Sequence, residues 1–374
     1  MTQVARDNHF VPQGYLRRWA DAEDKVWCHR LLVSDARVPR WKRHSVRGIG
    51  FHEHLYTTIL AGEESDQFER WIAEEFDTPG QEVIAKAVSE ARLTREDWKA
   101  LIRYVAAQDV RTPARYAEST KRWGTDLQSL IQETLTKTIS EWEAADDAGR
   151  ERLKRERGKQ RLSGPDKPDF PFKVSVKPDR VKGGGWISAE TIVGRQLWLA
   201  SIRWLLTRTV TVLYEHRWSI MRAPDGLSWT TSDDPVIRLN YNTEQDYNFG
   251  GGWGSRGSEF LFPLSPSHVL YTQIGHRHDS RINVTSEFAM KLHRIIAEHA
   301  HRWVYASAPL NHIDTLRSRK VDRQMYVDEM RAWRAWHSEQ TAAELELQAL
   351  PANESSSRMD MNEGGRAPTG MPSA

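Results

Sequence analysis

Apolar side chains recur three and four positions apart through much of the first half of the chain. This spacing predicts helices over residues 66–76, 83–91, from 94 into the region of 112, and 116–142. Thr94 precedes the clearest of these helices, and Asp97 follows three residues later, which is a variant of the capping box that starts a helix. Pro79 and Gly80 predict an interruption between the first two helices. A longer apolar stripe predicts a helix over 187–214.

A period of two residues is typical of strands and dominates elsewhere. It predicts strands over 25–33, 51–58, 260–264, 269–272 and 303–306. Segments 217–222 and 227–231 flank a Pro-Asp-Gly turn and predict a hairpin. We therefore expect an α+β protein, in which a helical N-terminal half packs on a largely antiparallel sheet from the C-terminal half.

The predicted elements are interrupted by a stretch of different composition. Residues 143–185 begin with a dense run of charges, continue with several prolines and end in three glycines. We expect a connector or insertion there, within a single two-lobed domain over residues 1–345. Residues 346–374, which are rich in Asn, Ser, Gly and Pro, are predicted to form a disordered tail.

Three polar residues lie on the otherwise apolar face of the helix that begins at Thr94. They are Gln108, Arg111 and Arg115, and Pro113 between them cannot donate a hydrogen bond to the carbonyl of Asp109. One interpretation is a kinked helix whose polar groups are satisfied by neighbouring backbone. The other is that these three side chains line a polar cavity.

Two further segments combine polar chemistry with apolar surroundings. Alternation along 227–233 places Asp233 on the same face as Trp229, so its carboxylate should point inward and need partners, with Ser232 beside it. At the N-terminus, Pro12 imposes an extended entry that can present His9. His9 and Asp233 are both candidate general bases.

Composition adds a weak bias towards anionic partners. The 374 residues carry a formal net charge of only +2, so the protein as a whole does not attract nucleic acid strongly. Residues 36–50 nevertheless contain Arg40, Lys42 and Arg43 and no acidic residue. This stretch is either a solvated face or a phosphate-binding one. Many of the 16 tryptophans adjoin a cation, as in Arg302-Trp303, which fits amphipathic packing or base stacking.

Other classes of protein find little support in the sequence. Cys28 is the only cysteine, which suits a reducing compartment, and we expect a cytoplasmic protein with no leader and no membrane span. His52-Glu53-His54 and the cluster around His276 lack the partners and spacing of known zinc motifs, so no metal site is assigned. No cofactor and no oligomeric state can be identified.

Three ordered motifs carry a family resemblance. They are His9-x-Val11-Pro12-x-x-Tyr15-Leu16-Arg17, Gln108-x-x-Arg111-Thr112-Pro113 and Thr231-Ser232-Asp233-x-Pro235. The chain resembles the mainly bacterial domain-of-unknown-function 4238 family over roughly residues 5–310. It departs from that family at Asp234, where Asn or a similar residue is expected. The resemblance implies no reaction, but it implies that the three motifs belong to one unit.

Two hypotheses of function follow from these residues. In the first, the protein is an enzyme acting on a phosphate-containing substrate such as nucleic acid, as a nuclease or phosphodiesterase would. Arg111 and Arg115 would clamp the anion, and Gln108 and Ser232 would orient it. His9 or Asp233 would act as the base or as a metal ligand. In the second, the protein is a non-catalytic module that recognises nucleic acid or protein. The stretch that contains Arg40, Lys42 and Arg43 would then bind the partner, and the polar centre would be structural.

Overall fold

The computed structural model describes residues 4–60, 62–160, 170–178 and 185–349. The described residues of Met1–Arg115 and Arg208–His337 form one compact unit, and those of Tyr116–Thr207 and Ser338–Gly370 form a second. Residues 346–349 of the predicted tail are helical, and its remainder lies outside the described residues.

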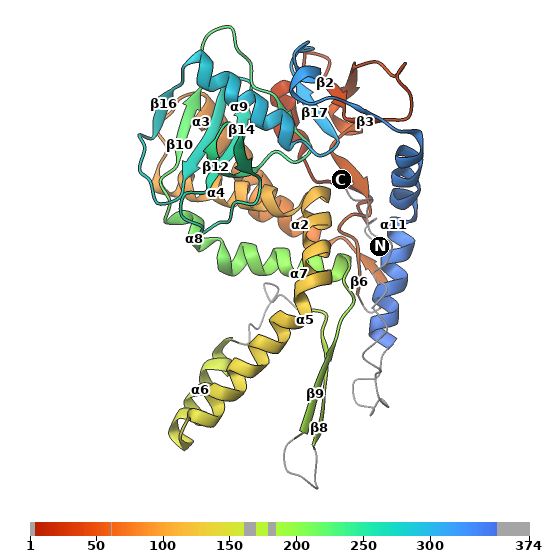
Figure 1. Cartoon of the computed structure of the whole chain (residues 1–374), viewed down its shortest axis with the longest axis vertical. Helices are drawn as coiled ribbons and strands as arrows, with labels where there is room; N and C mark the ends of the chain where they lie inside the picture. The colour runs from red at the N-terminus through yellow and green to blue at the C-terminus, as the bar shows by residue number, and fades with distance from the viewer. Residues whose placement is uncertain (1–3, 61, 161–169, 179–184, 350–374) are drawn as a thin grey trace. The chain divides into compact units, whose positions relative to one another are not determined.

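A six-stranded sheet is the largest element of the first unit (Figure 1). Its order is β13 (Asp246–Asn248), β12 (Ile237–Thr243), β14 (Glu259–Ser265), β15 (His268–Gln273), β10 (Ser219–Arg222) and β16 (Arg281–Asn283). Every pairing is antiparallel except that of β10 with β16. The predicted strands at 260–264 and 269–272 are confirmed as the hairpin β14–β15.

Both faces of this sheet are covered. On one face, Leu261 packs in a cluster with Leu292 and Ile295 of α9 (Ser286–His299), which crosses the strands in Figure 1. On the other face, the ring of Phe262 lies 5.9 Å from that of Tyr104 in α4 (Arg95–Val110). Because β14 is buried on both sides, its sequence is a continuous apolar run rather than an alternation.

The N-terminal helices are continuous where an interruption was predicted. α2 (Gln67–Ile72) continues through a π-helical segment (Ala73–Asp77) into α3 (Thr78–Val88), so the predicted break at Pro79 is wrong. Pro79 lies in the first turn of α3, where its missing N–H is tolerated. The capping box is confirmed, because Thr94 Oγ1 accepts from the N–H of Asp97 at 3.1 Å and Asp97 Oδ2 accepts from that of Thr94 at 2.9 Å.

A four-stranded antiparallel sheet joins the two halves of the chain. Its order is β11 (Thr231–Ser232), β17 (Trp303–Ala306), β2 (Lys25–Arg30) and β4 (Trp41–Ser45). The α+β class is therefore confirmed, but the N-terminal half contributes strands as well as helices. The predicted hairpin is wrong: the turn at Gly226 forms, with φ +82°, yet β10 and β11 belong to different sheets.

Three two-stranded ribbons complete the first unit. They are β1 (Asp7–His9) with β5 (Phe51–Glu53), β6 (Thr58–Leu60) with β7 (Glu63–Ser65), and β3 (Leu32–Val33) with β18 (Lys320–Val321). The short helices α1 (Gln13–Leu16), α8 (Thr211–Tyr214) and α10 (Ile313–Leu316) also belong to it. Tyr15 of α1 is completely buried and donates a 2.7 Å hydrogen bond to the carbonyl of Pro263. The N-terminal stretch is therefore part of the core.

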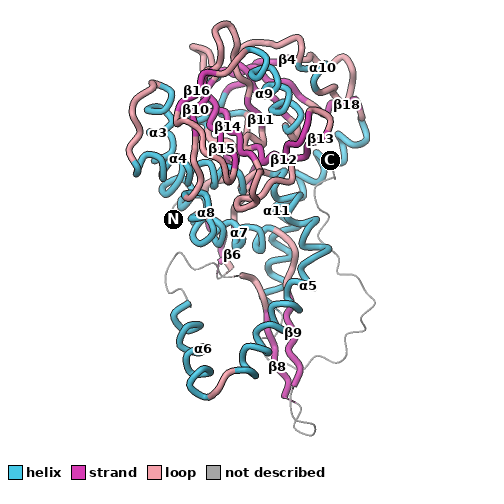
Figure 2. Tube along the Cα trace, turned by 60° about the vertical axis from the view of Figure 1, so that its left-hand side comes forward, coloured by secondary structure: helices cyan, strands magenta, loops and turns pink. Residues whose placement is uncertain are grey.

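The second unit is mainly helical. It contains most of α5 (Pro113–Ala144), α6 (Asp147–Gln160), the ribbon β8 (Lys173–Pro178) with β9 (Gly185–Glu190), α7 (Arg195–Trp204) and the end of α11 (Arg323–Ala349), all labelled in Figure 2. The predicted helix over 187–214 is wrong at its start, where β9 lies, and a π-helical segment (Leu205–Thr209) interrupts it. Arg195 is fully buried and pairs with Glu344 at 2.8 Å.

Among the described residues, every helix is too short or too polar to cross a lipid bilayer.

Gly80 allows α3 and α4 to approach closely. A Cβ placed on Gly80 would lie 2.3–2.6 Å from ring and Cβ atoms of the buried Tyr104. We expect Gly80→Ala to destabilise the protein by about 1–3 kcal/mol through overpacking. Gly124 in α5 is the control, because nothing lies within 4 Å of a Cβ there. Gly124→Ala should be neutral or stabilising by up to about 1 kcal/mol. Urea unfolding of both variants measures the difference, and equal stabilities would contradict the packing described.

Candidate functional site

Arg111 lies at the junction of α4 and α5. Helix α4 ends at Val110 and Pro113 begins α5, so the chain breaks there rather than continuing as a kinked helix. Arg111 is fully buried, and its terminal nitrogens donate to Asp77 at 2.9 and 2.7 Å. Burial alone would lower the pKa of Arg111, but the charge and hydrogen bonds of Asp77 outweigh it and raise that pKa above its ordinary value. The guanidinium remains a cation.

Gln108 connects this ion pair to the N-terminal motif. Its Oε1 accepts from Arg111 Nη2 at 2.9 Å, and its Nε2 donates to the carbonyl of Phe10 at 2.6 Å. The hydroxyl of Tyr56 donates to the carbonyl of Arg111 at 2.7 Å. The side chains of Gln108 and Arg111 are thus both engaged within the core.

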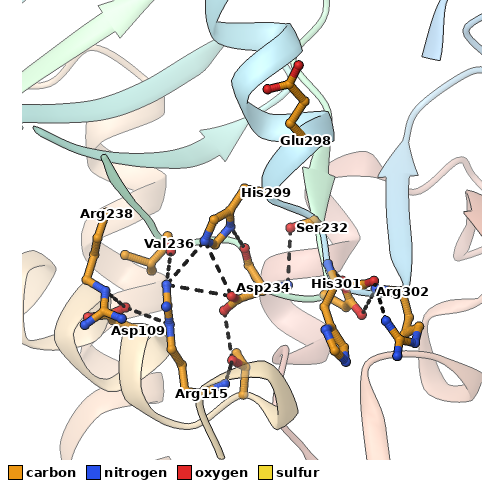
Figure 3. Close-up of polar contacts among 12 residues, drawn as sticks. Asp109, Arg115, Ser232, Asp234, Val236, Arg238, Glu298, His299, His301 and Arg302 are labelled. Carbon is orange, nitrogen blue, oxygen red and sulfur yellow. Dashed lines mark hydrogen bonds and ion pairs between the residues drawn. The ribbon is translucent and has the colours of Figure 1, made fainter. Parts of the chain in front are cut away.

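Arg115 forms a second buried network, shown in Figure 3. Its Nε lies 3.3 Å from Asp109 Oδ1, and its Nη2 donates to the carbonyl of Val236 at 3.1 Å. The same nitrogen lies 3.7 Å from Asp234 Oδ2. Trp253 Nε1 donates to the other oxygen of Asp109 at 2.7 Å. Arg238 Nε lies 3.5 Å from Asp109 Oδ1, so two arginines, Arg115 and Arg238, balance the charges of Asp109 and Asp234.

Asp234 links the second and third motifs. Thr112 Oγ1 donates to Asp234 Oδ1 at 2.8 Å, and the N–H of Asp234 donates to Ser232 Oγ at 3.2 Å. His299 Nδ1 lies 2.9 Å from the carbonyl oxygen of Asp234. Burial lowers the pKa of His299 to about 3, so its imidazole is neutral. The carboxylate of Asp234 is thus accommodated by Arg115 and Thr112.

Asp233 lies inward, as predicted. Its side chain accepts backbone hydrogen bonds from His301 at 3.0 Å and from Arg302 at 2.8 Å, and the residue is only 5% exposed. Burial raises the pKa of Asp233 to about 7, although the donated N–H bonds oppose the shift. Ser232 and Asp234 are buried as well, so tertiary packing rather than strand alternation accounts for this burial.

The site residues predicted at the N-terminus and in the basic stretch contact residues other than Asp233. His9 is half-buried on β1, its ring 5.3 Å from that of Phe51 and its Nε2 3.3 Å from Gln13 Nε2; burial lowers its pKa. In the basic stretch, Arg40 pairs with Asp314 at 3.0 Å and Arg43 pairs with Asp21. Acidic residues from outside the basic stretch thus form ion pairs with it. Lys42 in this stretch is exposed.

A pocket of about 560 Å³ lies within the first unit. Asp233 is the one candidate site residue from the sequence that lines it. The other lining residues are Phe10, Arg30, Phe51, His52, Glu53, His54, Pro113, His301, Arg302, Trp303, Glu329, Met330, Trp333, Arg334 and His337. Pockets of this size hold small molecules or parts of larger ones.

The pocket combines aromatic walls with cations. Arg30 lies between the rings of Trp303 and Tyr326, at 4.8 and 4.5 Å, and its Nη1 donates to the Tyr326 hydroxyl at 3.2 Å. In the part of the chain that the structure describes it forms no ion pair. Arg334 on α11 is exposed and likewise has no carboxylate partner among the described residues. Arg302, by contrast, pairs with Glu329 at 2.6 Å. Two arginines at the pocket therefore lack a carboxylate partner among the described residues, and Arg334 is the more open to an anion because Arg30 already donates to Tyr326.

Sequence patterns drew attention to few of these lining residues. Arg302-Trp303 is one of the cation–tryptophan pairs noted in the sequence, and Arg302 is one of the two residues whose N–H groups donate to Asp233. The sequence motifs do not include Arg30, Trp333 or Arg334, and only the fold brings these residues together.

The comparisons define the family. The family model described as "Protein of unknown function (DUF4238)" matches residues 7–309, so the chain belongs to this family. No curated protein and no solved structure matches the chain.

The Arg111–Asp77 pair is predicted to stabilise the fold strongly. Arg111→Ala leaves Asp77 without its partner in a mostly buried site, which should cost roughly 3–5 kcal/mol of unfolding free energy. Lys99→Ala on the same helix removes an exposed pair with Glu96 and should cost less than about 1 kcal/mol. Chemical denaturation compares them, and a small loss in Arg111→Ala would contradict this structural role.

Asp233 should also make stability depend on pH. The folded protein holds a proton on Asp233 that the unfolded chain releases, between an ordinary carboxyl pKa of roughly 4 and the raised pKa of about 7. Stability conferred by this proton is present at low pH and is lost as pH rises through that window. Asp233→Asn should flatten the fall in urea midpoint over this range, and the exposed Asp225→Asn should not. An unchanged slope in Asp233→Asn would refute the assignment.

Proposed function

We propose that the pocket binds a phosphate-bearing ligand with a planar base, such as a nucleotide or the end of a nucleic acid strand, and that the protein hydrolyses its phosphate ester. The observation that carries this proposal is that Arg30 and Arg334 line the same pocket as Asp233 and have no carboxylate partner in the part of the chain that the structure describes. Arginine forks match phosphate oxygens.

The walls of the pocket fit the base part of such a ligand. Phe51, Trp303 and Trp333 offer ring faces, and the ring of His52 lies 3.8 Å from that of Trp333. Aromatic faces stack on any nucleobase, with little preference for sequence. Burial lowers the pKa of His301 to about 3, so this lining imidazole adds no charge.

Asp233 is suited to act as the general base. Each carboxylate oxygen accepts one backbone N–H and keeps capacity for a second hydrogen bond. In the proposed step, water attacks phosphorus and passes a proton to Asp233. The P–O bond to the leaving alcohol then breaks, and that oxygen takes a proton from solvent. The raised pKa of about 7 brings Asp233 close to the optimum for such a base.

This proposal changes the roles suggested by the sequence. Arg111, Arg115, Gln108 and Ser232 become supports of the fold around the pocket, since their polar atoms engage the protein itself. His9 has no assigned part in the chemistry.

Ligand binding and turnover can be tested separately. Tryptophan fluorescence of the full chain is titrated with nucleoside monophosphates and short DNA and RNA strands, and hydrolysis is followed with and without divalent metals. Arg334→Ala should weaken binding about tenfold or more, as expected for loss of a hydrogen bond to a charged group. Asp233→Asn should keep binding and slow turnover roughly 100-fold or more.

Arg331→Ala is the matched control. It lies one helical turn before Arg334 on α11, is highly exposed, pairs with Asp328 and does not line the pocket. It should bind and turn over as the wild type does. Binding without turnover in any condition would favour the recognition module instead. Failure of every phosphate ligand to bind, or equal effects of the two arginine variants, would overturn the proposal.

A further inference from the structure

Three potential metal ligands meet at the edge of the same pocket. One nitrogen each of His54 and His337 and one carboxylate oxygen of Glu64 lie within 4.8 Å of one another. His54 and His337 also line the pocket that contains Asp233. We propose that these three residues bind a divalent transition metal ion of the zinc class, with an open coordination position facing the pocket.

The ligand set is the main argument. Two imidazoles and one carboxylate hold zinc in many catalytic sites, in which a fourth position is left for water or substrate. His337 Nε2 donates to Glu64 Oε1 at 2.8 Å, so a metal ion would take the place of the shared proton. The side chains of His337 and Glu64 are 27% and 43% exposed, so they have room to adjust to metal–ligand bonds of about 2.0–2.2 Å.

His54 is held in position by its surroundings. Its φ of +55° lies in the left-handed region, which costs a non-glycine residue free energy and is common at functional sites. Its N–H donates to the carbonyl of Arg6 at 2.8 Å, and its carbonyl accepts from Trp336 Nε1 at 3.3 Å. These bonds fix the backbone in that conformation.

The ring of His54 is oriented as well. Its Nδ1 lies 3.2 Å from the hydroxyl of the fully buried Thr57, which makes Nε2 the nitrogen for the metal. A hydrogen bond on the second ring nitrogen is the usual support of a metal-binding histidine. The ring stacks on that of His337, with centroids 4.0 Å apart and an interplanar angle of 16°. A metal ion lies near the plane of each imidazole that binds it, so the partly exposed ring of His337 must turn out of this stack to bind the ion together with His54.

No sequence spacing could reveal this group. Glu64 is ten residues after His54 on a different ribbon, and His337 comes from α11 near the end of the described chain. The sequence places His52 two residues before His54, in a pattern to which no metal site was assigned, and the ring of His52 packs against Trp333.

The site can be tested by metal binding alone. The full chain is stripped with a chelator and titrated with Zn²⁺ against a chromophoric competitor. The wild type should bind one Zn²⁺, and Co²⁺ should give the visible bands of a tetrahedral site with nitrogen and oxygen ligands. His337→Ala and Glu64→Gln should each weaken Zn²⁺ binding by roughly 100-fold. Circular dichroism should show that both variants remain folded, because the altered side chains are partly exposed.

His278→Ala is the control, since it removes an exposed histidine outside this group and should leave Zn²⁺ affinity unchanged. A wild type that binds no Zn²⁺, or variants with wild-type affinity, would overturn the proposal. Because these measurements involve no phosphate ligand, and nucleotide binding can be measured with chelator present, the metal site and the proposed function can fail independently.

Discussion

The junction of α4 and α5 imposes the constraint on which the first unit depends. Helix α4 ends inside the core, and the polar residues that follow must find partners there, because a buried cation without a partner is very costly. Arg111 forms an ion pair with Asp77 at the end of the π-helical segment, and Arg115 forms ion pairs with Asp109 and Asp234. These ion pairs tie together segments that are up to 120 residues apart in the sequence.

The same constraint places the pocket. Gln108 donates a hydrogen bond to the carbonyl of Phe10, and Thr112 donates one to Asp234. The N-terminal motif and the motif around Asp233 are therefore brought to one end of α4. Phe10, Pro113 and Asp233, one from each motif, all line the pocket. The motifs thus form one unit, but most of their polar side chains support the pocket rather than face it.

Chemistry at the pocket therefore comes from a different set of side chains. Arg30 enters from β2, Trp303 from β17 and Arg334 from α11, and none belongs to the family motifs. Behind this lining, the ion pairs of Arg111 and Arg115 hold the surrounding segments in place. Such an arrangement suits a binding site, because pre-organised groups lose little freedom when a ligand binds. The proposed metal site lies on the same lining, at His54 and His337.

The sequence by itself determined the α+β class, the start of α4 at Thr94 and the strands β14 and β15. These features rest on local periodicity, capping and turn chemistry, which short segments contain completely. It did not determine that β10 and β11 lie in different sheets, that β2 and β4 lie in one sheet with β17, or that Arg111 forms an ion pair with Asp77. Strand partners and buried ion pairs depend on residues far away along the chain. Only the tertiary structure decided them, and with them which residues line the pocket.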